Sequence, residues 1–516
     1  MGITHRVPSE PPMPTTDCMP SLRLDFHPSR AVDVTFDAPA TSSDGGWLLA
    51  RAMDEVRGTT ADTAAQLHDP RDPLRVEHDM RTLVRQRVFQ ILAGYEDAND
   101  ANSLRHDPLL RLVCDRDPDG APLASQPTLS RLETRVRARD VVQMQRAHER
   151  RWVASLPQDL PVVVLDIDGT DDPTHGQQQF AFYNSHYGST IYAPLLIFDQ
   201  DGRLVSARMR PGTHHLTQFA AATLERLIRL IRSRFPTLPI LVRADAAFGV
   251  ASVVNRLDSL RDELGAVDFL LGVSPNSAVR RGAAAALTRA TALAAKRADG
   301  RARSYDVGVY QSETWSRAHR LVIKAEKTST STDIRSVAST LDALPPRLSY
   351  VLYGGRGDAE NRIKDFKRGL MADRLSCHLY LANAFRLQLH AAAYELLHAL
   401  RERLEASGSE SLAATDTATD TATDTTATDC GESSARENLS AYLGRCLYVA
   451  AIVDAAPARR LARPEFSTLR QLLLKVSVTV RSSVRRVWIA LPRAFPAAAV
   501  FRRLLASLEV LPAQTT

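Results

Sequence analysis

The chain has 516 residues and carries 65 Lys and Arg against 59 Asp and Glu, a formal net charge of +6. This length predicts roughly two to four domains, and the modest basic excess permits a polyanionic partner without requiring one. The five cysteines form no C-x-x-C pair, which excludes the common zinc patterns, and no apolar run approaches the roughly 18 residues of a membrane span. We therefore expect a reduced, cytoplasmic, unexported protein with no membrane partner.

The first 158 residues divide into two regions. Residues 1–45 are rich in Pro, Thr, Ser and Asp and should form an arm with at most one short strand, near Val32 to Phe36. Residues 46–158 carry apolar residues at three-to-four spacing, as in MRTLVRQRVFQILAGY, which predicts a helical domain. Within it, Ser125 to Glu133 fits either a recognition-type helix suited to DNA or an ordinary helix of a bundle.

The next region alternates strands and helices. The segments PVVVLDIDGT, IYAPLLIFD and RLVSARMRP predict three strands, the last two joined as a hairpin through Asp199 to Gly202. A helix, the strand PILVRAD, a second helix and the strand AVDFLLGV follow. Because crossovers between parallel strands are right-handed, the fourth strand should lie beside the first. This order predicts an α/β, ribonuclease-H-like core, a mixed five-stranded sheet with helices.

The acids that end the first and fourth strands would become neighbours in this sheet. They are Asp245 and either Asp166 or Asp168, which lie two residues apart and so on one face of their strand. Converging carboxylates repel one another unless a cation neutralises them, and Mg²⁺ prefers such hard oxygen ligands. We therefore expect two Mg²⁺ ions, with Mn²⁺ as a substitute, although an isolated strand-end aspartate is more often a turn former.

A second motif lies further along the chain, where the spacing Y-x2-R-x3-E-x6-K is formed by Tyr353, Arg356, Glu360 and Lys367. On a helix, Lys364 and Lys367 would flank Glu360 on one stripe. The glycines at 354, 355 and 357 indicate that this helix begins near Asp358, with Arg356 on the entering loop. The chain has only six lysines, which favours a requirement for these two over an ordinary solvated basic face.

From Val162 to Lys367 the chain resembles the catalytic domain of a DDE-type insertion-sequence transposase, in the branch with this Y-x2-R-x3-E-x6-K signature. The D-G-T context favours Asp168 as the first acid, and Asp245 and Glu360 match the second and third. The resemblance implies that these three acids are catalytic and hold the metal ions. It also implies that Tyr353, Arg356, Lys364 and Lys367 contact the DNA of the transposon end.

The resemblance further implies the partners and the place of action. The protein would bind its terminal inverted repeats and target DNA, act as a homodimer when the ends are synapsed, and work in the bacterial cytoplasm on the nucleoid. The catalytic domain would comprise residues 159–275 and 348–405, with residues 46–158 as the DNA-binding domain.

An inserted β-rich subdomain is expected at residues 276–347, since strand-like segments, including the later RLSYVLYGG, separate Asp245 from Glu360. Its tryptophan, Trp315, is either a core residue or a platform that holds a base flipped out of the DNA end.

The remaining residues are expected to form a low-complexity linker at 406–436, which contains the Thr/Ala/Asp tract 413–429, and a basic C-terminal region at 437–516. Between Glu465 and Glu509 there are eight cations and no acid, and KVSVTVRSSVRRVWIAL predicts a β-hairpin with a basic turn. Such a surface suits either phosphates or solvent.

Two other functions fit part of this pattern. A simple metal-dependent nuclease would need the acids but not the cations of the signature. A domesticated or inactive DNA-binding derivative would keep the basic surfaces and lose acids, yet all three acids are present.

Overall fold

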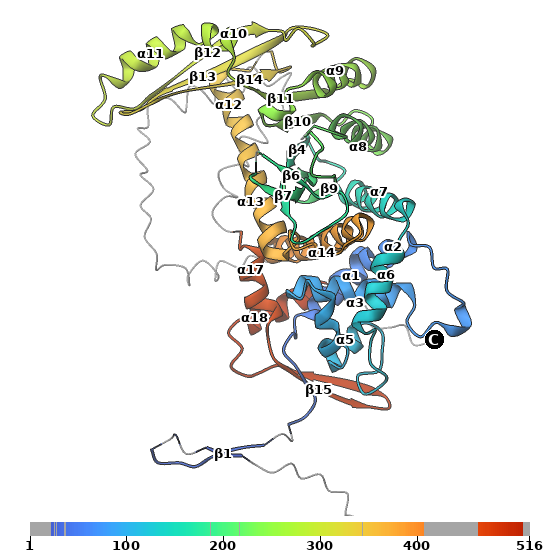
Figure 1. Ribbon diagram of the computed structural model, residues 1–516. Coiled ribbons are helices and arrows are strands. Elements are labelled where there is room, and N and C mark those ends of the chain that lie inside the picture. The colour runs from blue at the N-terminus through green and yellow to red at the C-terminus, as the bar shows by residue number, and fades with distance from the viewer. Residues whose placement is uncertain are drawn as a thin grey trace, which may run out of the picture.

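The computed structural model describes residues 22–406, apart from residues 25, 27, 36, 37, 186, 216 and 343, and residues 463–508. The Thr/Ala/Asp tract at 413–429 lies outside the described residues. Figure 1 shows a helical body at one end, a central sheet, and an extension of that sheet at the other end. No described helix is long and apolar enough to cross a membrane.

The central feature is an eight-stranded sheet with the order β12-β13-β14-β11-β10-β4-β8-β9. Its first five strands in the chain are β4 (Val163–Gly169), β8 (Leu195–Asp199), β9 (Leu204–Arg208), β10 (Ile240–Ala244) and β11 (Val267–Val273). β10 runs parallel to both β4 and β11, whereas β8 and β9 form an antiparallel hairpin. The predicted pairing of the fourth strand with the first is therefore confirmed.

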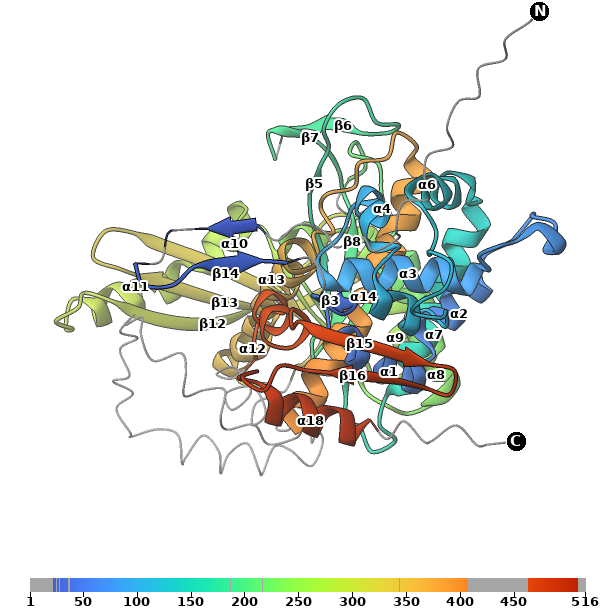
Figure 2. The same cartoon turned by 90° about the horizontal axis from the view of Figure 1, so that it is seen from below.

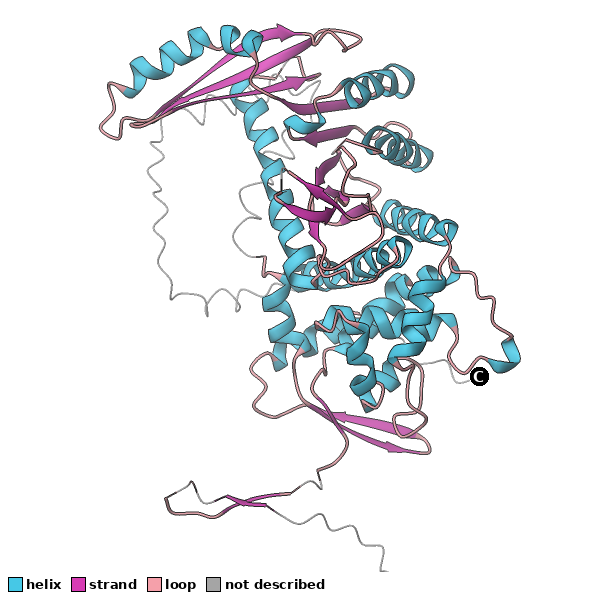
Figure 3. Cartoon of the chain, viewed as in Figure 1, coloured by secondary structure: helices cyan, strands magenta, loops and turns pink. Residues whose placement is uncertain are grey.

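Helices cover both faces of these strands, and their apolar spacing explains why. In α8 (Ala220–Arg234), Leu224, Leu227, Ile228 and Ile231 recur at three-to-four spacing and are fully buried. α9 (Ala251–Leu264) packs beside α8 on the same face (Figure 3). On the opposite face, Leu352 of α12 (Pro346–Gly354) packs with strand residues of β4, β10 and β11. The strands are buried on both sides, as their unbroken apolar sequences require.

Three further strands extend the sheet beyond β11: β12 (Ala302–Tyr310), β13 (His319–Lys327) and β14 (Thr332–Ser339). β14 pairs antiparallel with β11, so these strands continue the central sheet. The helices α10 (Ser277–Gly282) and α11 (Ala284–Ala294) precede them, and α11 packs on β12 and β13. The expectation of a strand in RLSYVLYGG is wrong, because this segment forms α12.

The helical body is built around the 27-residue helix α14 (Tyr380–Ala406). Its other long helices are α1 (Trp47–Arg57), α2 (Thr59–Ala65), α3 (Met80–Ala93), α6 (Gln126–Arg135) and α7 (Ala138–Ser155). α3 shows the expected end signals: the Asp79 side chain accepts a hydrogen bond from the Thr82 N–H, and Gly94 ends the helix with φ of 95°. Shorter elements are η1 (Pro73–Arg75), η2 (Ala98–Asp100), α4 (Ala101–Leu104) and α5 (Pro108–Val113).

The C-terminal segment belongs to the same body. It comprises α17 (Phe466–Leu469), the π-helical turn η6 (Arg470–Leu474), β15 (Val478–Ser483), β16 (Arg486–Ala490) and α18 (Ala498–Ser507). Leu469, Leu474 and Phe501 share one apolar core with Trp47 and Phe89 of the N-terminal helices. The predicted hairpin is confirmed, and β15 also pairs with β3 (Thr41–Ser42).

The remaining strands are peripheral. β1 (Leu22–Leu24) pairs with β2 (Val32–Val34), which lies where the sequence predicts a strand, whereas β1 was not expected. β5 (Asp172–Pro173), β6 (Phe182–Asn184) and β7 (Ser189–Tyr192) form a separate small sheet; in the chain they lie between β4 and β8.

Candidate active site

Two acids meet where β4 and β10 end. The parallel register pairs Ala244 with Ile167, and Asp245 and Asp168 are the residues that follow these two; the charge of Asp245 acts on Asp168. Asp245 caps the 3₁₀ turn η3 (Ala246–Phe248), and its carboxylate accepts a hydrogen bond from the Ala247 N–H at 3.0 Å. The side chain of Asp168 is 14% exposed. The two acids thus lie at one edge of the sheet, as the topology predicts.

Asp166, the alternative first acid, has a different environment. It is fully buried, and its carboxylate accepts two hydrogen bonds from Arg243 at 2.7 and 2.8 Å and one from Arg362 at 3.1 Å. Arg243 also donates to the Leu352 carbonyl at 2.6 Å, and Arg362 donates to the Asp199 carbonyl at 2.6 Å. Asp166 therefore joins the sheet to the helices of the signature motif, and both of its oxygens are engaged by arginines.

The signature motif lies on a nearly continuous helical run. α12 passes through the 3₁₀ turn η4 (Gly355–Gly357) into α13 (Asp358–Lys364) and the π-helical turn η5 (Asp365–Gly369), and Figure 1 shows α12 and α13 as one column. The expectation that the helix begins near Asp358, with Arg356 on a loop, is therefore wrong. A Cβ added at Gly355 would lie 2.5 Å from Nη1 of Arg243, so this glycine allows the guanidinium to approach the helix.

Arg356 lies between two of the predicted acids. Its guanidinium is 3.2 Å from Oδ2 of Asp168 and 3.7 Å from Oε1 of Glu360. The Glu360 side chain is 71% exposed. Burial raises the pKa of Asp168 to about 6, Arg356 opposes that shift, and the charges of Asp245 and Glu360 add to it. The three acids are thus electrostatically coupled around one arginine.

Tyr353 completes the group from the helix side. A Cβ at Gly272 would lie 2.7 Å from the Tyr353 hydroxyl and 2.9 Å from the Asp245 carbonyl carbon, which places this hydroxyl beside β11 and Asp245. Burial raises the pKa of Tyr353, and the charge of Asp245 acts in the same direction. The phenol is therefore a neutral hydrogen-bonding group at neutral pH.

Lys367 of the motif and the neighbouring Lys364 point to different places. Lys367 lies 2.7 Å from the carboxylate of Asp171, just beyond β4, and both side chains are largely buried. Lys364 lies 2.7 Å from the carboxylate of Glu465, at the start of the C-terminal segment. Lys367 therefore lies beside Asp171, three residues after Asp168. Lys364 is one turn beyond Glu360 on α13, as predicted, but its ammonium pairs with the C-terminal segment.

Trp315 fits the core interpretation. Its side chain is 4% exposed, and its ring centroid is 5.3 Å from that of Tyr310 and 5.6 Å from that of His319. A base could stack on this ring only if the surrounding core opened. The expectation that Trp315 contacts DNA therefore does not fit the structure.

Sequence reasoning missed several neighbours of the site. Asp172 is buried, and neither of its carboxylate oxygens has a hydrogen-bond partner among the described residues. Burial, reinforced by the charge of Asp373, raises the pKa of Asp172 well above its ordinary value. Tyr187 also adjoins the acids, since burial and the charges of Asp171 and Asp168 raise its pKa. The sequence did contain one signal of a buried charge pair: Arg243 lies inside an otherwise apolar strand, which indicates a buried acidic partner such as Asp166.

The family described as Transposase DDE domain group 1 matches residues 25–418, well over half of the chain. The chain belongs to this family. A solved piggyBac transposase synaptic complex with hairpin DNA is similar with a TM-score of 0.39 and 11% identity, over 72% of this chain and 79% of that chain. Among curated proteins there is no match.

DDE transposases generally use divalent metal ions, and the donor set here has the required chemistry. Three carboxylates share one electrostatic environment, and the pKa of Asp168 is raised to about 6 because burial and the neighbouring acids disfavour its charge, which a bound cation would compensate. No group of three His, Cys, Asp or Glu side chains within residues 22–406 and 463–508 is already close enough to hold an ion. Asp168, Asp245 and Glu360 thus have the ligand chemistry that a divalent metal ion needs. To bind one together, the exposed Glu360 side chain would have to approach the other two acids.

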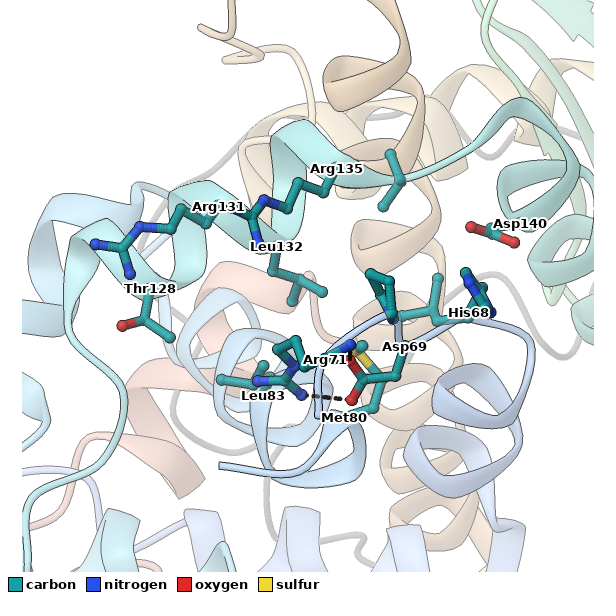
Figure 4. A pocket seen from close by; sticks show the side chains of 13 residues that line it. His68, Asp69, Arg71, Met80, Leu83, Thr128, Arg131, Leu132, Arg135 and Asp140 are labelled. Atoms are coloured by element: carbon teal, nitrogen blue, oxygen red, sulfur yellow. Dashed lines mark hydrogen bonds and ion pairs between the residues drawn. The ribbon is translucent and has the colours of Figure 1, made fainter. Parts of the chain in front are cut away.

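A pocket of about 150 Å³ lies away from the acids of this transposase, in the helical body. Figure 4 shows Arg131 and Arg135 of α6 on one side of it and Arg71, which donates to Asp69 at 2.7 Å, on the other. The predicted helix at Ser125 to Glu133 is confirmed as α6. Its role in DNA recognition stays a prediction.

Proposed function

We propose that this transposase cuts DNA at the inverted-repeat ends of its own insertion sequence and joins those ends to target DNA. Asp168, Asp245 and Glu360 are the catalytic acids and hold two Mg²⁺ ions, for which Mn²⁺ can substitute. The observation that carries the proposal is the meeting of Asp168 and Asp245 at the ends of β4 and β10, with Arg356 joining Asp168 to Glu360.

The fold supports this assignment. The strand order β9-β8-β4-β10-β11, with β8 and β9 antiparallel and β10 parallel to β4, agrees with a ribonuclease-H-like core. In such a core the acids lie at the ends of the two central strands, and β4 and β10 are those strands here. The third acid then comes from a helix that crosses the sheet, which is the position of α13.

Asp168 rather than Asp166 is the first acid. A metal ligand needs lone pairs that face the substrate, whereas the oxygens of Asp166 are occupied by Arg243 and Arg362. The raised pKa of Asp168, to about 6, is the behaviour of a buried carboxylate that lacks enough cation. Asp166 instead fixes the helix that carries Glu360 against the strand that carries Asp168.

Bound Mg²⁺ would polarise the attacked phosphate and stabilise charge on the attacking and leaving oxygens, in hydrolysis and then in transesterification. The chain's own cations orient the DNA. Arg356 exchanges its contact with Asp168 for a phosphate when the acids are neutralised, and Lys367 presents its ammonium from beside Asp171. The Tyr353 hydroxyl donates a hydrogen bond to a phosphate oxygen.

These proposed roles agree with the branch that has the Y-x2-R-x3-E-x6-K signature. Lys364, which lies outside that signature, has no DNA contact in this proposal because it pairs with Glu465. One chain contains one set of acids, and an element has two ends. We therefore propose a homodimer on the synapsed ends, acting on the bacterial nucleoid.

The decisive experiment uses the inverted repeats that flank the coding sequence as labelled duplexes. The protein should bind them and cut at their ends in Mg²⁺ or Mn²⁺ but not in EDTA. Asp168→Asn, Asp245→Asn and Glu360→Gln should each abolish cutting and leave binding largely intact. Binding without cutting by the wild type would identify an inactive derivative, and cutting at unrelated sequences would identify a simple nuclease.

A further inference from the structure

The β15–β16 ribbon of the C-terminal segment has two different faces. The antiparallel register pairs Arg481 with Trp488 and Ser483 with Arg486. Because side chains alternate along a strand, these four residues share one face, and Val478, Val480, Ser482, Val487 and Ile489 share the other. The ribbon is therefore amphipathic, with its cations and its aromatic ring on the same side.

The inner face fixes the ribbon to the helical body. Val478 and Val480 are buried in the main core, and Ile489 packs against it. The Ser482 hydroxyl donates to the carboxylate of Asp119 at 2.6 Å, and β15 pairs with β3. The base of the ribbon is thus held rigidly, and its outer face is presented at a defined angle. Figure 2 shows it running along the outside of the helices.

The outer face has the composition of a contact surface. Trp488 is 52% exposed, and Val484 at the turn is fully exposed. No acid among the described residues forms an ion pair with Arg481, Arg485 or Arg486. Some exposed arginines elsewhere in the described chain do have acidic partners, such as Arg229 with Glu225 and Glu263. The outer face thus brings a half-exposed tryptophan together with arginines whose charge no described acid balances.

Charge complementarity indicates what covers this face. Cations without acids attract a polyanion and repel a basic protein surface, and this chain is itself basic, with a net charge of +6. Two-stranded ribbons fit the major groove of DNA, and an indole flanked by guanidinium groups can stack on a base or pack on sugars while the arginines bind phosphates. DNA satisfies all three features of the face together.

We propose that the β15–β16 ribbon is a second DNA-contacting element, which binds the transposon end at a distance from the cleavage site. Figure 1 places the ribbon on the helical body, on the far side of α14 from the sheet that carries Asp168 and Asp245. It therefore contacts base pairs internal to the cut. The ribbon also lies beyond residues 25–418, the part matched by the family. The inference rests on the proposed function, since it takes DNA ends as the ligand.

The test uses the full-length protein and two duplexes, a long end and an end truncated on its internal side. Arg481→Ala and Arg486→Ala should each lower the salt slope of binding to the long end by about one unit, and Trp488→Ala should weaken that binding roughly 5- to 150-fold. Trp488→Phe should recover most of the loss. Footprints of the alanine variants should lose internal protection and keep protection at the cut.

Arg229→Ala is the matched control, because it removes an exposed arginine whose charge is already balanced, and its slope should equal that of the wild type. Melting temperatures of all variants establish that they fold. Should Trp488→Ala fail to fold, Arg481→Gln and Arg486→Gln test the same contact, because their side chains are exposed and each should lower the salt slope of binding to the long end.

Three results would overturn the proposal. If the folded variants bound DNA with the affinity, salt slope and footprint of the wild type, the ribbon would not be part of the DNA interface, and the proposed function would stay intact. Loss of dimer formation in light scattering, with DNA contacts retained, would make the ribbon a protein surface. A wild-type protein that binds neither duplex would refute both the ribbon's role and the proposed function.

Discussion

Replacing Asp166 or Asp168 by asparagine should have opposite effects on stability, although the two residues lie on one strand. Asp166 is fully buried and shared by Arg243 and Arg362. Asp166→Asn leaves those two guanidinium groups without their anion in a dry environment. Removing one partner of a buried pair destabilises a protein by about 3–5 kcal/mol. We expect that loss here, with the helix that carries Glu360 loosened as well.

Asp168→Asn should instead stabilise the protein without metal. The folded-state pKa of Asp168 is raised from 3.8 to about 6, so its favourable contribution exists only below the unfolded-state pKa and is lost as pH rises through about 6. At 1.36 kcal/mol per unit this shift corresponds to roughly 3 kcal/mol at pH 7, as an upper limit. The substitution removes that penalty and flattens the dependence of stability on pH between about 4 and 6.

The assay is urea unfolding in EDTA at several pH values, followed by the same measurement in Mg²⁺. Mg²⁺ should raise the unfolding midpoint of the wild type and leave that of Asp168→Asn unchanged, because a bound ion stabilises only the state that binds it. If Asp166→Asn unfolded at the wild-type midpoint and lost cleavage, while Asp168→Asn kept cleavage, the assignment of the two acids would be reversed.

Three other perturbations test the remaining contacts. Gly355→Ala should destabilise the protein by about 1–3 kcal/mol and slow cleavage, since its Cβ would meet Arg243 at 2.5 Å. Gly354→Ala and Gly357→Ala, where nothing lies within 4 Å, should be neutral or stabilising by up to about 1 kcal/mol. Equal melting temperatures for all three variants would contradict this prediction. Trp315→Ala should cost about 3–5 kcal/mol and slow every reaction step alike, whereas a selective loss after nicking would restore a base-holding role. Arg356→Ala and Lys367→Ala should each lower the salt slope of end binding by about one unit, and an unchanged slope in a folded variant would assign that cation to structure.

The order of the central strands could be predicted from the sequence because each strand is a short apolar run bounded by turn residues. Handedness then placed β10 beside β4, so the meeting of Asp168 and Asp245 followed from topology. The choice between Asp166 and Asp168 could not follow. It depends on Arg243 and Arg362, which lie 77 and 196 residues from Asp166 in the chain.

The helix through the glycines shows a different limit. Local propensity favours a break at Gly354, Gly355 and Gly357, at roughly 1 kcal/mol per glycine. Tertiary contacts override that preference, because Arg243 binds the Leu352 carbonyl and occupies the space that a side chain at Gly355 would fill. One of the glycines that signal a loop, Gly355, is here what lets a buried arginine reach the helix.

The C-terminal segment carries this reasoning furthest. Its sequence predicted a hairpin and a basic surface but no place in the fold, since its apolar partners, such as Trp47 and Phe89, lie some 400 positions earlier. Lys475 reaches back to Asp44 at 2.7 Å, and the Lys364–Glu465 pair connects the segment to α13 at 2.7 Å. One segment thus touches both the helical body and the helix that carries Glu360. If the β15–β16 ribbon binds DNA, the same covalent unit connects that binding site to the catalytic helix. Glu465→Gln removes the ion pair to α13 and keeps the hydrogen bonds that Phe466 and Arg470 donate to η5; it should slow cleavage while leaving the ribbon's footprint unchanged.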